Sequence, residues 1–123
     1  MATITEDYVS FETAKLLVRK GFGFNAEYES YYTLGGVVIY FKDKTQDINI
    51  APRITLQMAR KWLRKVHNIN IDIVPVWNHK QFEYQVFIVT PENAKHCYVD
   101  EKLYLGYEEA AEAGIKYCLE HLI

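Results

Sequence analysis

Three segments of this chain have the residue spacing of amphipathic helices, and strand-like runs rich in Val, Ile, Tyr and Phe lie between them. The helical segments are residues 10–21, 54–68 and 107–122. Each repeats apolar residues every three or four positions, as a helix with one buried face does. The pattern predicts a single α+β domain over residues 1–123. In this fold a mainly antiparallel sheet has three helices packed on it, in the order α-β-β-α-β-β-(β)-α.

Residues that typically start or end a helix lie at the ends of the first two helical segments. Ser10 is the predicted N-cap of the first helix, because its hydroxyl can accept a hydrogen bond from a first-turn N–H. Gly21 is expected to end this helix in a left-handed conformation, with Phe22 folding back onto the last turn. Pro52, which helices tolerate in their first turn, predicts that the second helix opens at residues 51–52. Asn68 is its predicted left-handed end.

The second helix has an apolar stripe along one side. Trp62 lies in the middle of this stripe, flanked by Met58 and Val66, and we expect its ring to be buried between helix and sheet. The residues of the stripe are Leu56, Met58, Ala59, Trp62, Leu63 and Val66.

Five runs have strand character. They are residues 27–33, 37–42, 69–77, 82–90 and, as a short strand, 96–100. The first two are joined by a glycine-bearing turn typical of a hairpin. Pro75 predicts that its strand lies at a sheet edge or bulge, and the continuous apolar run 86–89 indicates burial on both faces.

Composition narrows the classes of protein that the chain can belong to. It has 123 residues, half of them hydrophobic, and a formal net charge of −2, so no global field favours polyanions. The first residues lack the pattern of a signal peptide, and no apolar run approaches membrane-spanning length. We therefore expect a cytoplasmic protein without membrane contact.

Cys97 and Cys118 form no disulfide framework, and we expect two reduced thiols, with Cys118 buried.

One stretch of the chain is strongly basic. No acidic residue occurs between Ile48 and Ile71, and the cations there are Arg53, Arg60, Lys61, Arg64 and Lys65. A basic helix face can neutralise phosphates, so these residues are candidates for nucleic-acid binding. The same pattern is typical of a solvated face, or of one that meets the acidic third helix or a partner chain. The acidic net charge favours these other readings.

A tyrosine cluster is the candidate for partner binding. Tyr28, Tyr31 and Tyr32 lie on one predicted strand, and tyrosine provides a large contact area with a polar tip. Alternation along the strand places Tyr31 on the face opposite Tyr28 and Tyr32, and we expect it to be the most accessible of the three. The alternative is a hairpin whose tyrosines pack on the sheet.

Catalytic and metal-binding patterns are missing from the sequence. His96 and Cys97 are adjacent, so they point to opposite faces of a strand, and no spaced Cys/His pair exists. Glu108, Glu109 and Glu112 have the pattern of a charged helix start. No catalytic residue, metal ligand or cofactor site is predicted, and an enzyme is the third choice of function.

Three stretches of the chain resemble small uncharacterised proteins of phages and prophages of gut Bacteroidetes. They are SFETAKLLVRKGF, APRITLQMARKWLRKVHNI and YEEAAEAGIKYCLEHLI. The resemblance runs through helix stripes and helix ends, so it implies a genomic context and transfers no functional residue.

Residues 53–123 have the predicted order α-β-β-β-α, which resembles that of a double-stranded-RNA-binding domain. Such domains hold phosphates with a lysine cluster that opens the last helix, where this chain has Tyr107-Glu108-Glu109. Their Gly-Pro-x-His loop is replaced by Asn78-His79-Lys80. The resemblance implies a shared fold without RNA binding. The sequence thus favours a small non-enzymatic accessory protein that binds a protein or itself, with nucleic-acid binding by the second helix as the alternative.

Overall fold

The computed structural model describes residues 7–22, 31–32, 38–39, 51–76, 80–89, 94–99 and 102–123, with the backbone alone described at 31, 39, 89 and 94–99. The predicted α+β class is confirmed, and the predicted order of elements holds except for an additional short strand before the second helix. The helices are α1 (Phe11–Arg19), α2 (Leu56–His67) and α3 (Tyr107–His121). The strands are β1 (Tyr31–Tyr32), β2 (Val38–Ile39), β3 (Ala51–Pro52), β4 (Ile69–Val76), β5 (Gln81–Val89) and β6 (Ala94–Val99).

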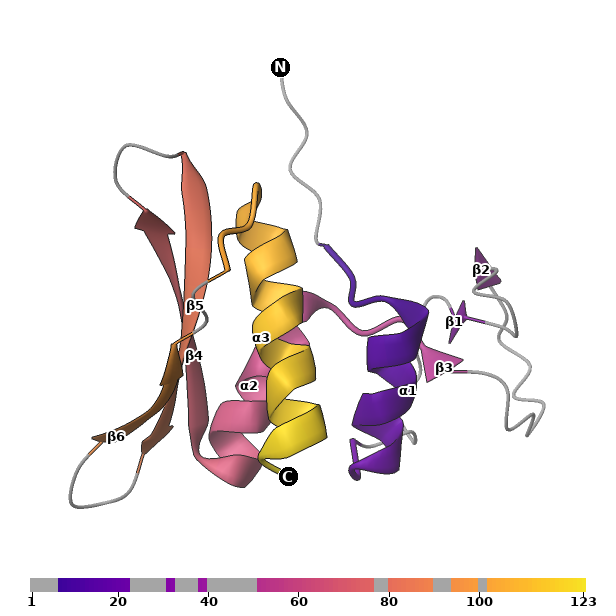
Figure 1. Cartoon of the computed structure of the whole chain (residues 1–123). Coiled ribbons are helices and arrows are strands. Elements are labelled where there is room, and N and C mark those ends of the chain that lie inside the picture. Colours follow the sequence, from indigo (N-terminus) through magenta and orange to yellow (C-terminus); the bar gives the residue numbers. More distant parts are fainter. Residues whose placement is uncertain are drawn as a thin grey trace.

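The described strands form two antiparallel sheets, a division that the sequence did not specify. The larger sheet has the order β4-β5-β6 and the smaller one the order β2-β1-β3. Figure 1 shows α2 and α3 on one face of the larger sheet, and α1 on the far side of α3 beside the smaller sheet. The order α2-β4-β5-β6-α3 is the one predicted for residues 53–123.

The register of β4 and β5 builds the face beneath the helices. Ile71 pairs with Val86 and Ile73 pairs with Tyr84, so their side chains share one face of the sheet. Val86 is fully buried, whereas Phe87, on the other face, is only partly buried. The sequence predicted burial of residues 86–89 on both faces of the sheet, and this prediction is therefore wrong for the described side chains. Pro75 does lie on an outer strand of the described sheet, as predicted.

Most helix ends follow the sequence. Ser10 Oγ accepts a hydrogen bond of 3.3 Å from the Thr13 N–H. Gly21 has a φ of 102°, and the N–H of Phe22 donates to the Leu17 carbonyl at 2.9 Å. Asn68 is left-handed at the end of α2, with a φ of 57°. These three predictions are confirmed.

The predicted start of the second helix is wrong. Ala51 and Pro52 form β3, which pairs with β1. The helix begins at Leu56, because the Thr55 hydroxyl accepts a 3.1 Å hydrogen bond from the Met58 N–H and caps the first turn. Pro52, which has no N–H to donate, lies on an outer strand of the described small sheet.

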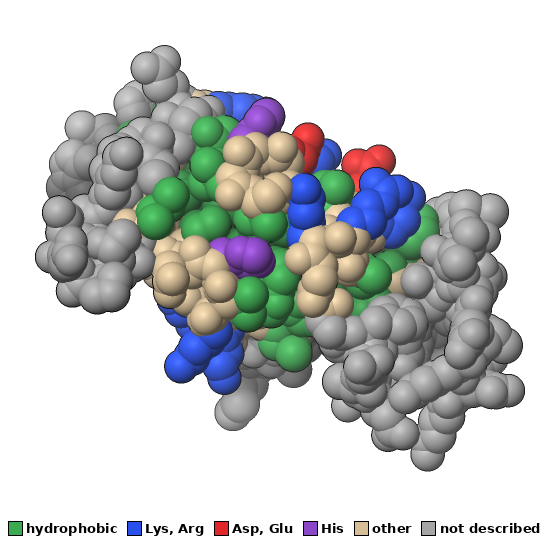
Figure 2. All heavy atoms as spheres, turned by 90° about the horizontal axis from the view of Figure 1, so that it is seen from below, with side chains coloured by type: hydrophobic (Ala, Val, Ile, Leu, Met, Phe, Trp, Pro, Cys, Tyr) green, Lys and Arg blue, Asp and Glu red, His purple; other side chains and the backbone are tan. Residues whose placement is uncertain are grey.

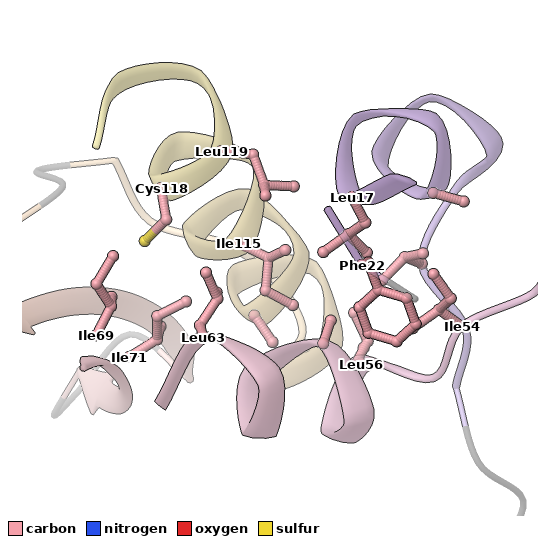
Figure 3. Packing of buried hydrophobic residues seen from close by; sticks show 14 of the residues in the cluster. Leu17, Phe22, Ile54, Leu56, Leu63, Ile69, Ile71, Ile115, Cys118 and Leu119 are labelled. Carbon is pink, nitrogen blue, oxygen red and sulfur yellow. The ribbon is translucent and has the colours of Figure 1, made fainter. Parts of the chain in front are cut away.

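Helix α3 lies at the centre of the core. Figure 3 shows Leu63, Ile71 and Ile115 meeting from α2, β4 and α3, with Leu17 and Phe22 on the side of α1. The buried residues of α3 are Ala110, Ala111, Gly114, Ile115, Cys118 and Leu119. Cys118 is fully buried, as predicted, while the side chain of Cys97 lies outside the described part.

Gly114 allows α3 to lie close to the sheet. A Cβ atom at this position would be 2.9 Å from Ile71 Cγ2 and 3.1 Å from Tyr84 Cδ1. Both distances are shorter than ordinary van der Waals contact, so a larger residue would push the helix from β4 and β5.

Candidate functional site

Arg60 connects three elements of the fold. Its Nη1 donates to the Tyr107 hydroxyl and its Nη2 to the Ile71 carbonyl, each at 2.7 Å. The guanidinium therefore links α2, α3 and β4. Two of its donor atoms are engaged inside the protein, so Arg60 is a structural residue in this fold, although the sequence placed it with the cations of the outer face.

Arg53 also packs within the fold. Its guanidinium carbon lies 4.0 Å from the centroid of the Tyr8 ring and 5.7 Å from that of Tyr32. Such stacking is favourable for a cation that is partly removed from water. Lys61, Arg64 and Lys65 are the predicted basic residues that remain exposed, all on α2.

The tyrosine cluster is described only in part. The Tyr32 hydroxyl donates to the Val9 carbonyl at 2.7 Å, and its half-buried ring lies 5.8 Å from that of Phe11. Tyr32 thus packs toward α1. Tyr28 lies outside the described residues, and of Tyr31 only the backbone is described, so the expected accessibility of Tyr31 stays a prediction.

The expected burial of Trp62 between helix and sheet is wrong, and the residues that flank it in the apolar stripe are exposed. Met58 is 47% exposed and Val66 is 57% exposed. Trp62 is only partly buried; its ring lies 5.7 Å from Phe22 and 4.7 Å from His67. These side chains are exposed because the apolar stripe is wider than the part of α2 that other elements cover. The β4 strand and α3 cover the sector of α2 that holds its buried residues, while the other edge of the stripe faces outward.

A surface hollow of about 350 Å³ lies over this outward edge. We call it the α2 groove; its residues are Phe22, Met58, Lys61, Trp62, Lys65 and Val66. Aromatic and aliphatic side chains line it together with two lysines. Figure 2 shows the end of the molecule where α2 and α3 terminate, and hydrophobic side chains reach the surface there beside lysine and arginine. Exposed apolar surface rimmed by charge is typical of protein-binding sites.

A second hollow, of about 470 Å³, is acidic and lies where α3 begins. Its lining residues are Asp7, Tyr8, Leu56, Lys102, Tyr104, Glu108, Glu109, Glu112 and Ala113. Glu112 Oε1 accepts from the Ser10 N–H at 2.7 Å and from the Thr13 hydroxyl at 2.8 Å, which ties α3 to the start of α1. Among the described residues, no group of three His, Cys, Asp or Glu side chains could hold a metal ion.

Two apolar side chains stand exposed beside the acids of this end. Leu105 is 75% exposed and Tyr107 is 42% exposed, immediately before Glu108 and Glu109. We call these four residues the acidic end. Sequence reasoning identified the glutamates as a helix start and missed Leu105, since a single leucine before a helix carries no signal of exposure.

No protein-family model, curated protein or solved structure matches the chain. None of the helices in the described ranges is both long and apolar enough to cross a membrane.

Proposed function

We propose that this chain is a small, non-enzymatic protein-binding module whose binding surface is the α2 groove. The observation that carries the proposal is the exposure of Met58 and Val66 beside the half-buried Trp62, on a helix whose other side is in the core. Covering such side chains removes apolar area from water, which favours binding by about 25 cal/mol of free energy per Å² buried. Tryptophan is also among the residues that most often anchor interfaces. The resemblance of three stretches to phage and prophage proteins makes an accessory role in a mobile element part of the proposal.

The charges at the groove specify the chemistry of the partner. Lys61 and Lys65 are exposed at its edge, and Arg64 is exposed on the same helix. A segment with apolar side chains for the hollow and carboxylates for the lysines is complementary in both respects. Complementary charges at the rim of an interface speed association and exclude partners of the wrong sign.

Protein binding is favoured over nucleic-acid binding because the two arginines of the basic stretch that are not exposed make contacts within the fold. Arg60 donates to Tyr107 and Ile71, and Arg53 stacks on Tyr8. Three exposed cations therefore remain of the five that the sequence offered. Lys61, Arg64 and Lys65 are neighbours on one face of α2, and the apolar side chains of the groove lie along one side of them. Affinity for nucleic acid rises with the number of phosphates that cations neutralise, so three free cations support it less than five would. The apolar side chains beside them add to protein binding and not to phosphate binding.

The test is fluorescence anisotropy with a labelled helical peptide of about 15 residues that carries leucine and glutamate on one face, a typical helix-in-groove ligand. A short RNA duplex is the competing probe. We expect the peptide to bind the protein and Lys61→Glu with Lys65→Glu to weaken it by at least about tenfold, or about 1.4 kcal/mol. The matched control, Arg19→Glu with Lys80→Glu, reverses two exposed cations elsewhere and should bind like the parent.

Two results would contradict the proposal. One is equal peptide affinity of the Lys61→Glu/Lys65→Glu protein and the control. The other is steeply salt-dependent binding of the duplex, lost in the groove variant, with no binding of the peptide; this result would establish the nucleic-acid alternative.

A further inference from the structure

The chain itself carries a segment with the chemistry that the α2 groove selects. The large hydrophobic side chains exposed in the described part of the chain fall into two pairs. Met58 and Val66 lie with the lysines of the α2 groove, and Leu105 and Tyr107 lie with Glu108 and Glu109 at the acidic end. The first pair is set among lysines. The second lies beside two carboxylates, with Arg60 bonded to the Tyr107 hydroxyl. The two surfaces are complementary in charge, and both present apolar side chains to cover.

The two surfaces point in different directions on one molecule. Tyr107, at the acidic end, contacts Arg60. Residues two apart on a helix differ by about 200°, so Arg60 and Met58 project from nearly opposite sides of α2. The acidic end therefore lies on the side of α2 away from the groove, and a single copy cannot fill its own groove.

We infer that the chain associates with itself head to tail, with the acidic end of one copy in the α2 groove of the next. This rests on the proposed function, in which the groove binds a protein segment, and it names that segment as residues 105–109 of a second copy. Leu105 enters the apolar hollow, and Glu108 and Glu109 face Lys61 and Lys65. Such a contact joins two different surfaces, so each pair of copies leaves one groove and one acidic end unused, and the assembly grows or closes into a ring.

Sedimentation equilibrium of the full chain tests the inference. A contact this small is expected to be weak, so the concentration runs from about 10 μM to about 1 mM. The weight-average mass of the parent should rise above that of one chain with concentration. At about 1 M salt the mass should fall toward the monomer, because the charges are exposed and screened.

Two single variants separate the surfaces. Val66→Asp damages the groove and Leu105→Asp damages the acidic end, and both residues are exposed, so the fold should be retained. Each variant alone should be monomeric. An equal mixture should form a dimer and nothing larger, because one variant supplies an intact groove and the other an intact acidic end. Lys80→Asp, an exposed change elsewhere, should associate like the parent. Met58→Asp serves as the groove variant if circular dichroism shows that Val66→Asp is unfolded.

A parent that stays monomeric over the whole range overturns the inference, as does a mixture no heavier than its components. Failure here is distinguishable from failure of the proposed function. If the parent is monomeric but still binds the leucine-glutamate peptide through the lysines, the groove binds protein and only the second copy as its partner is wrong. If the peptide does not bind either, both fail.

Discussion

Helices α2 and α3 lie on the same sheet and both have amphipathic sequences, yet they have different surroundings. α3 lies between the sheet and α1 and also contacts α2, and six of its fifteen residues are buried. α2 has three buried residues among twelve, and its Met58, Trp62 and Val66 side chains line the groove. The comparison shows that an apolar stripe is buried only over the sector that another element covers. The uncovered sector of α2 is the part available to a partner.

The charged residues of the two helices divide in the same way. Arg60 and Glu112 each reach across to another element and are engaged by hydrogen bonds there. Lys61 and Glu108 point outward. Charged residues thus connect elements of the fold on one side of each helix and are exposed to solvent on the other side.

The largest effect should separate the two sides of α2. Leu63 is fully buried, and Leu63→Ala should lower the free energy of unfolding by about 3 kcal/mol through lost burial and a residual cavity. Met58→Ala, on the outer side, should change it by less than about 0.5 kcal/mol. Urea denaturation measures both. Equal losses would mean that the two sides of α2 do not differ in packing.

A somewhat smaller effect should come from the closest contact of α3. Gly114→Val should cost about 2 kcal/mol, because its Cβ would press against Ile71 and Tyr84. Glu120→Ala, on the exposed side of the same helix, is the control and should remain within about 0.5 kcal/mol. Thermal unfolding of both proteins decides the matter, and a Gly114→Val protein as stable as the control would show that α3 does not need close approach.

The link between α3 and the start of α1 should contribute less. Glu112→Ala removes the acceptor of the Ser10 N–H and the buried Thr13 hydroxyl, and should cost about 1.5 kcal/mol. Glu112→Gln retains an oxygen at that place and should recover most of the loss. If both variants lose the same stability in urea, the hydrogen bonds do not account for the effect.

The smallest effect on stability is expected at the groove itself. Lys61→Glu with Lys65→Glu should leave the melting temperature within a few degrees of the parent, since both side chains are exposed and surface changes alter stability by no more than about 0.5 kcal/mol. Differential scanning calorimetry measures it. A large loss would show that these lysines belong to the fold, and weakened peptide binding could then no longer be assigned to the groove.

Sequence patterns predicted the parts of this fold that depend on local chemistry. The caps at Ser10 and Asn68 and the burial of Cys118 follow from hydrogen-bonding capacity and helical period, and they are present. The α2 start was misplaced because Pro52 is compatible with an outer strand as well as with a first turn. A glycine within an alanine-rich helix costs about 1 kcal/mol, so Gly114 offered a signal of close packing that was not used.

The candidate site was less predictable, because its residues differ in what they contact and not in their type. Arg60 and Lys61 are adjacent cations, and only the position of Tyr107 and Ile71 engages one of them. Met58 and Leu63 both belong to the apolar stripe, and only the placement of α3 and β4 decides which is covered. These facts depend on contacts between residues far apart in the chain.

Amide chemical shifts of the chain, followed while the leucine-glutamate peptide is added, show whether the outer side of α2 is the binding surface. We expect the largest shift changes on residues 58–66 of α2 and on Phe22. Amides at Ala111 and Ile115, in the core side of α3, should change little. Shift changes concentrated at Tyr31 and Tyr32, with residues 58–66 unaffected, would contradict the claim and assign binding to the tyrosine strand.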